Sequence, residues 1–70
     1  MPMRLSRLAS VLSRYGIELE TGTKHFKFRG PGRPVFPVPA HNGKKTMVPD
    51  AYIRGVCRHF DLNPDEIKNG

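Results

Sequence analysis

The fold is decided by residues 23–29, whose sequence is TKHFKFR. Polar and apolar residues alternate here, and a period of two is typical of a half-buried β-strand. Phe26 and Phe28 therefore point toward a core. The opposite face carries a histidine and two cations, His25, Lys27 and Arg29. This stretch predicts a strand with one packing face and one face suited to chemistry.

The neighbouring segments complete a three-stranded sheet. Residues 17–20 alternate apolar and acidic side chains, which predicts a short strand ending at a turn over residues 21–22. After a turn rich in Gly and Pro, residues 34–39 predict a third strand. Because Pro37 and Pro39 lack N–H groups on the same edge, this strand should pair on one side only and lie at the edge of the sheet.

A helix is expected before the sheet. Its apolar stripe recurs at helical spacing, at Leu5, Leu8, Leu12 and Tyr15. Ser6 is the expected N-cap, although the helix can also start nearer Met3. Gly16 follows the last periodic residue and suits the left-handed conformation that ends many helices.

A second helix is expected after the sheet, beyond a polar loop over residues 40–48. Pro49 suits the first helical position and Asp50 suits the first turn. The apolar stripe of this helix is Ile53, Val56, Cys57 and Phe60. Residues 63–66 start a final helical turn that ends by Gly70.

The expected fold is α+β, in the order α-β-β-β-α with a terminal helical turn, as one domain over residues 1–70. A chain of 70 residues supports one modest core. It has no apolar stretch long enough to span a bilayer and no apolar run of a signal peptide near its start. Because Cys57 is the single cysteine, an intramolecular disulfide is impossible, so we expect a cytoplasmic protein with no membrane partner.

The charge is positive and unevenly distributed. Twelve Lys and Arg face six Asp and Glu, which gives a net charge of +6 with neutral His. The excess lies in the first two thirds, where only Glu18 and Glu20 oppose the basic residues. A concentrated basic field attracts polyanions, which include nucleic acid, an anionic membrane and an acidic protein. The alternative is a basic surface that serves only solubility.

His25 is the strongest candidate for chemistry. Its cationic neighbours, Lys24, Lys27 and Arg29, favour the neutral imidazole and can bind a substrate phosphate. A neutral imidazole can activate a ribose 2′-hydroxyl to attack the adjacent phosphate, and nearby cations stabilise the charge that develops. The simpler alternative is an exposed histidine without a role.

The other polar candidates are weaker. His41 is either a second acid–base group or phosphate contact, or a solvated loop residue. His59 is expected at the boundary of an apolar stripe, and Cys57 in the core. Glu18 and Glu20 are expected to pair with cations across the hairpin. No Cys-x-x-Cys or His-Glu-x-x-His pattern occurs, so we expect no metal site and no cofactor.

Four pieces of the sequence, from about Leu5 to Ile67, resemble in their order and spacing the HicA family of mRNA interferase toxins. They are the helix ending in Tyr15-Gly16, the run Gly22-Thr23-Lys24-His25-Phe26, the run Val38-Pro39-Ala40-His41, and the proline-led second helix with Leu62-Asn63-Pro64-Asp65-Glu66. The second piece resembles the family's Gly-Ser/Thr-x-His-apolar motif, which puts the catalytic histidine at His25. Many members have a histidine where this chain has Lys24, so the general acid stays unassigned.

The resemblance implies a fold like the double-stranded RNA-binding domain, with two helices on one face of a three-stranded antiparallel sheet. It implies ribosome-independent cleavage of mRNA by a toxin of a toxin–antitoxin system, which inhibits translation and growth. It also implies an acidic HicB-like antitoxin, so we expect a monomer when free and a hetero-oligomer with that partner.

We therefore predict a metal-independent endoribonuclease with His25 as general base. The predicted RNA and phosphate contacts are Lys24, Lys27, Arg29 and His41. One alternative is a non-catalytic RNA-binding module of the same fold, which recognises shape and phosphates without a histidine. The other is a basic domain that binds an acidic protein.

Overall fold

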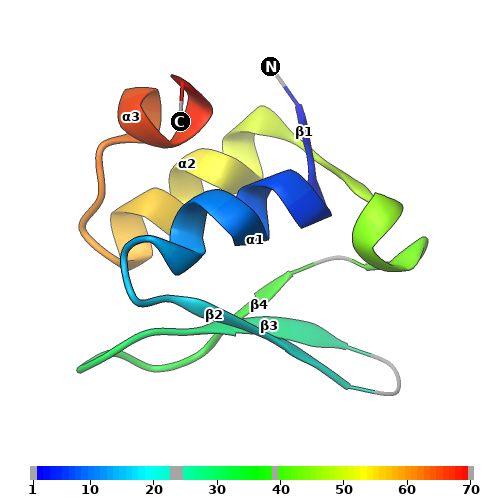
Figure 1. Cartoon of the computed structure of the whole chain (residues 1–70), viewed down its shortest axis with the longest axis horizontal. Coiled ribbons are helices and arrows are strands. Elements are labelled where there is room, and N and C mark those ends of the chain that lie inside the picture. The colour runs from blue at the N-terminus through cyan, green and yellow to red at the C-terminus, as the bar shows by residue number, and fades with distance from the viewer. Residues whose placement is uncertain (1, 23–24, 39, 70) are drawn as a thin grey trace.

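The computed structural model describes residues 2–22, 25–38 and 40–69, which form an α+β fold. The elements are β1 (Met3–Arg4), α1 (Leu5–Ser13), β2 (Glu18–Thr21), β3 (Phe26–Arg29), β4 (Phe36–Val38), the 3-10 helix η1 (Gly43–Lys45), β5 (Met47–Val48), α2 (Asp50–His59) and α3 (Pro64–Asn69). Strands β2, β3 and β4 form an antiparallel sheet in that order, and β1 pairs with β5 in a second sheet. Figure 1 shows α1 and α2 over one face of the three-stranded sheet, with α3 in a layer beyond them.

The predicted order α-β-β-β-α is wrong, because two short strands, β1 and β5, and the helix η1 interrupt it. The strands β1 and β5 pair in antiparallel fashion, and the Leu5 N–H donates to the Thr46 carbonyl over 2.8 Å. Two residues are too few for alternation to be visible in a sequence. Residues 40–48 therefore look like a polar loop, although part of this segment pairs with the start of the chain.

Helix α1 starts nearer Met3, which was the second expectation, and it ends at Ser13, two residues before the predicted Tyr15. Arg4, not Ser6, is the N-cap residue, and it makes no side-chain cap hydrogen bond. The pairing of β1 with β5 orders this start instead. Gly16 has φ +79°, which confirms the expected left-handed residue. Tyr15 was predicted in the apolar stripe but is 38% exposed.

The core lies between the three-stranded sheet and the helices. Buried side chains from these elements include Leu8, Leu12, Phe28, Val38, Ile53, Val56, Cys57 and Ile67. Phe28 is fully buried, whereas Lys27 and Arg29 on either side of it are exposed, so the predicted alternation of β3 is confirmed. Within the described part of the chain strand β4 pairs only with β3, which confirms its position at the sheet edge.

The second and third helices agree with the prediction within a residue. Helix α2 begins at Asp50, with Pro49 as its N-cap residue. Helix α3 begins at Pro64, and the Asn63 side-chain oxygen accepts the Asp65 N–H over 2.9 Å. Such a contact satisfies one of the unpaired N–H groups at a helix start.

Asp50 connects α2 to α3 electrostatically. Its carboxylate pairs with Lys68 of α3 and with Arg54 one turn further along α2, over 3.1 Å. The hydrogen bond from Lys68 is the largest cause that lowers the pKa of Asp50 from 3.8 to about 2. A carboxyl with a lower pKa in the folded state contributes stability above its unfolded pKa. That contribution is lost as the pH falls toward the folded pKa.

We therefore expect the free energy of unfolding to decrease as the pH falls from about 4 to about 2. Asp50→Asn should have less stability at neutral pH and a smaller decrease over this range. Urea unfolding at several pH values, followed by circular dichroism, measures both effects. Asp61→Asn, a change of the same kind at an exposed residue, is the control. If Asp50→Asn kept the full acid dependence, this ion pair would not be its source.

Candidate functional site

His25 lies in the loop of the β2–β3 hairpin, directly before β3, and it is exposed. The last pair of the two strands is Thr21 with Phe26, so the prediction that His25 belongs to the strand is wrong by one residue. The Gly22 N–H donates to the His25 carbonyl over 3.0 Å. A Cβ at Gly22 would lie 2.7 Å from that carbonyl oxygen, so this close approach requires glycine. The contact fixes the backbone that carries the imidazole.

The predicted phosphate contacts on β3 lie on its exposed face. Lys24 lies outside the described residues. Lys27 and Arg29 are both exposed, and residues two apart on a strand are separated by about 7 Å. Lys27 is therefore the cation nearer the hairpin loop, and Arg29 lies toward the other end of β3.

Two carboxylates of β2 share this face with the cations. In the strand register Glu20 lies opposite Lys27, and Glu18 lies opposite Arg29. Arg29 pairs diagonally with Glu20, with distances of 2.7 Å from Nε to Oε2 and 3.2 Å from the second nitrogen to Oε1. This contact lowers the pKa of Glu20 and raises the pKa of Arg29. The expected cross-hairpin ion pair is confirmed for Glu20, and Arg29 is thereby partly engaged.

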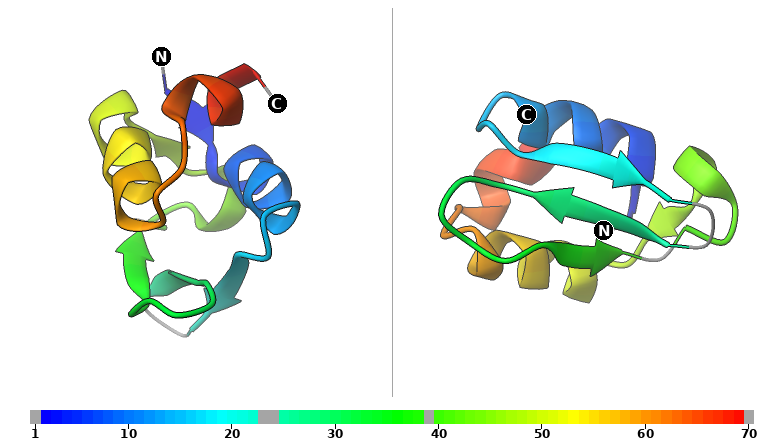
Figure 2. Two further views of the ribbon diagram at one scale, coloured as in Figure 1. Left: turned by 90° about the vertical axis from the view of Figure 1, so that its left-hand side faces the viewer. Right: turned by 90° about the horizontal axis from the view of Figure 1, so that it is seen from below.

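Further cations lie at the hairpin end of the molecule. Figures 1 and 2 show η1 on the same side of the molecule as the end of β2 and the start of β3, opposite the β3–β4 turn, and in Figure 1 η1 lies at the level of the helices, above the sheet. Helix η1 carries the exposed Lys44 and Lys45, and the exposed His41 lies in the turn before it. His25 and His41 therefore belong to two separate segments on one side of the molecule.

The sequence-based prediction did not include Lys44 and Lys45. The available indication was the Asn42-Gly43 pair, which is typical of a turn. The buried Thr46 closes this turn, because its hydroxyl donates to the Gly43 carbonyl over 2.7 Å and accepts the Asn42 N–H over 3.0 Å. An ordered turn of this kind presents both lysines to solvent.

His59 has a structural role. Its Nε2 lies 2.7 Å from the Pro34 carbonyl oxygen, and its ring lies 5.0 Å from that of Phe36 and 4.8 Å from that of Phe60, centroid to centroid. Arg33 donates to the His59 carbonyl over 3.0 Å. These contacts join the end of α2 to the segment before β4. The half-buried position confirms the expected boundary residue.

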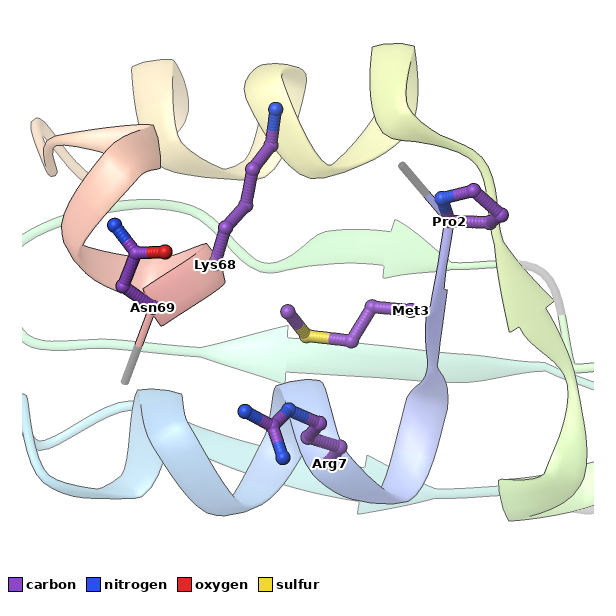
Figure 3. Close-up of a pocket in the computed structure, with 5 residues that line it drawn as sticks. All are labelled: Pro2, Met3, Arg7, Lys68 and Asn69. Carbon is purple, nitrogen blue, oxygen red and sulfur yellow. The ribbon is translucent and has the colours of Figure 1, made fainter.

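A hollow of about 380 Å³ lies away from these residues, near the two ends of the chain. Figure 3 shows Met3 between Arg7 and Lys68 there. The rest of its lining is Pro2 and Asn69. None of the predicted catalytic or phosphate-binding residues that the structure describes lines this hollow, so it is not assigned to the candidate site.

The described residues also limit other kinds of site. Within residues 2–22, 25–38 and 40–69, no group of three or more His, Cys, Asp or Glu side chains could hold a metal ion. Among the helices of that part of the chain, none combines the length and the apolar character that crossing a bilayer requires.

The chain matches no protein-family profile, no curated protein and no solved structure.

Proposed function

We propose that this chain is a metal-independent endoribonuclease of the HicA type, which cleaves mRNA and inhibits translation. The proposal rests on the exposed imidazole of His25. The backbone of His25 is held by the hydrogen bond from Gly22, and the residue lies directly before β3, the strand that carries Lys27. Lys44 and Lys45 add positive charge at the same end of the molecule. An RNA strand drawn there by its phosphates would meet an accessible general base.

In the proposed reaction the neutral imidazole of His25 takes the proton from a ribose 2′-hydroxyl. The 2′-oxygen attacks the adjacent phosphorus, and the bond from phosphorus to the 5′-oxygen of the next nucleotide breaks. Lys27 stabilises the negative charge that develops on the phosphate oxygens. The departing 5′-oxygen takes up a proton, for which His41 is the candidate donor. The products are a 2′,3′-cyclic phosphate and a 5′-hydroxyl end.

The arrangement of the elements supports a fold of the double-stranded RNA-binding type. Helices α1 and α2 lie on one face of the antiparallel sheet β2-β3-β4, and β1, β5, η1 and α3 are additions to that plan. This fold binds RNA through shape and phosphates, with little dependence on base sequence. It therefore supports RNA as the substrate class.

The net charge of +6 supports an acidic protein as the second partner. We propose a HicB-like antitoxin that covers the hairpin end and keeps RNA away from His25. Complementary charge would accelerate the encounter of the two proteins. The free chain would be a monomer in the cytoplasm, where its mRNA substrate is found.

The test is incubation of the purified chain with labelled RNA in the presence of EDTA. We expect cleavage to persist, and to give products that end in a 2′,3′-cyclic phosphate or its hydrolysis product. DNA of the same sequence is the control, because it lacks the 2′-hydroxyl and should stay intact. We also expect RNA affinity to fall steeply as salt rises, since each neutralised phosphate releases counterions.

The other outcomes identify the alternatives. RNA binding without cleavage would favour a non-catalytic RNA-binding module. Absence of RNA binding at low salt would favour a domain that binds an acidic protein. Cleavage of RNA that stops on chelation would contradict the metal-independent mechanism.

A further inference from the structure

A hollow of about 560 Å³ lies at the other end of β3 from His25. It opens between the α1–β2 turn and the β3–β4 turn, which Figure 1 shows on the same side of the molecule. Its charged lining residues are Glu18, Arg29 and Arg33, and the rest is glycine and proline of the two turns. The hollow is wide open to solvent, so it would contact a ligand from one side.

Both arginines of the hollow are anchored and still have unused N–H groups. Arg29 uses Nε and one terminal nitrogen on Glu20. Arg33 uses one terminal nitrogen on the carbonyl of His59. A guanidinium has five N–H donors, so each keeps donors for a ligand. Because the side chains are already held, little conformational freedom is lost when a ligand binds.

The acceptor of the hollow is Glu18. It lies directly opposite Arg29 in the strand register, but Arg29 pairs with Glu20 instead. Within the described part of the chain, the Glu18 carboxylate has no hydrogen bond and no ion pair. An exposed carboxylate beside two anchored arginines is therefore available to a ligand.

One wall of the hollow, at Gly30, packs against side chains of the core. A Cβ on Gly30 would lie 2.8 Å from the ring of Phe60 and 3.1 Å from the Ile17 side chain, so the backbone packs here as only glycine permits. At Gly16 and Gly32 a Cβ would meet nothing within 4 Å, which leaves the backbone of both turns open toward solvent. The hollow thus combines a supported wall with an open mouth.

The mixture of groups fits a guanine base better than a bare phosphate. A phosphate would meet the like charge of Glu18, and like-charge contacts select against a ligand. Guanine has acceptors at O6 and N7, to which arginine donates in pairs. Its Watson–Crick edge adds two neighbouring donors, N1–H and the 2-amino group, which can both reach one carboxylate. Adenine has no N1–H, so its 6-amino group alone could donate to the carboxylate.

We propose that this hollow binds a guanine base of the RNA, with Glu18 accepting from its Watson–Crick edge and Arg33 donating to its acceptors. The role in substrate choice rests on the proposed ribonuclease function, whereas guanine binding itself does not require cleavage. Arg29 lies four positions after His25, which is about 13 Å along an extended chain. The base is therefore recognised at a distance from the bond that is cleaved.

The test is a titration of the full chain with GMP, IMP and AMP, followed by NMR chemical shifts. GMP should bind most tightly, and AMP roughly ten-fold or more weakly, in line with the discrimination of one bidentate contact. IMP keeps N1–H but lacks the 2-amino group, so it should fall between them. Glu18→Gln should weaken GMP binding by a similar factor and leave AMP binding unchanged.

Glu66→Gln on α3 is the matched control, because it removes the same charge away from the hollow and should keep the preference for GMP. Circular dichroism of Glu18→Gln should match the unmodified chain, since the side chain is exposed. Equal binding of GMP and AMP, or an unchanged preference in Glu18→Gln, would overturn the guanine site.

The failure of this site is distinguishable from the failure of the proposed function. If RNA stays intact while GMP is preferred, the ribonuclease proposal fails and the guanine site stands. If RNA is cleaved while GMP binds no better than AMP, the ribonuclease stands and the guanine site fails.

Discussion

His25→Ala should lower the rate of RNA cleavage by about a hundred- to ten-thousand-fold, which is the usual contribution of a general base. The fold and the RNA affinity should stay nearly unchanged. The side chain is exposed, so its loss opens no cavity, and surface substitutions usually change stability by about 0.5 kcal/mol or less. The backbone contact from Gly22 to residue 25 does not depend on the imidazole. Cleavage rates, thermal melting and RNA binding measured on the same sample separate the three quantities.

His59→Ala is the control for the loss of a histidine as such. It removes the contact to Pro34 and the ring packing against Phe36, so it should lower the melting temperature. At a temperature where the variant is folded, it should still cleave RNA. Full activity in His25→Ala would show that the general base lies elsewhere. Loss of the folded circular dichroism signal in His25→Ala would show that His25 has a structural role.

The sequence predicts those elements whose periodicity extends over several residues. The alternation around Phe28 and the helical stripe of Ile53 and Val56 both correspond to buried side chains in the structure. The two-residue strands β1 and β5 could not be predicted, because their pairing joins segments more than forty positions apart in the chain and leaves no local pattern.

The candidate site was predictable in its residue types and less so in its geometry. The sequence puts Lys27 and Arg29 on the same face as the acidic residues of the neighbouring strand. Register alone predicts that Arg29 meets Glu18, which lies directly opposite. In the structure the long side chain of Arg29 instead reaches Glu20, its diagonal neighbour, so Arg29 does not pair with Glu18. Long side chains reach diagonal neighbours on a sheet, so register does not determine the pair that forms.

Phe28→Ala should remove a large part of the stability of the domain. Phe28 is fully buried in the central strand of the sheet, and truncation of a buried phenylalanine costs about 3 to 5 kcal/mol. A domain of this size has a free energy of unfolding of roughly 4 to 10 kcal/mol in total. Urea unfolding should therefore show a midpoint far below that of the unmodified chain, or a chain that is already unfolded.

Lys27→Ala, one position away, is the matched control for this loss. Its side chain is exposed on the opposite face of the same strand, so the free energy of unfolding should change by about 0.5 kcal/mol or less. The same substitution should weaken RNA binding, because it removes a cation near His25. The two neighbouring positions would thus separate folding from RNA binding within one strand. Equal stability loss at both positions would mean that β3 does not divide into a packed face and a free one, and the proposed RNA surface would lose its support.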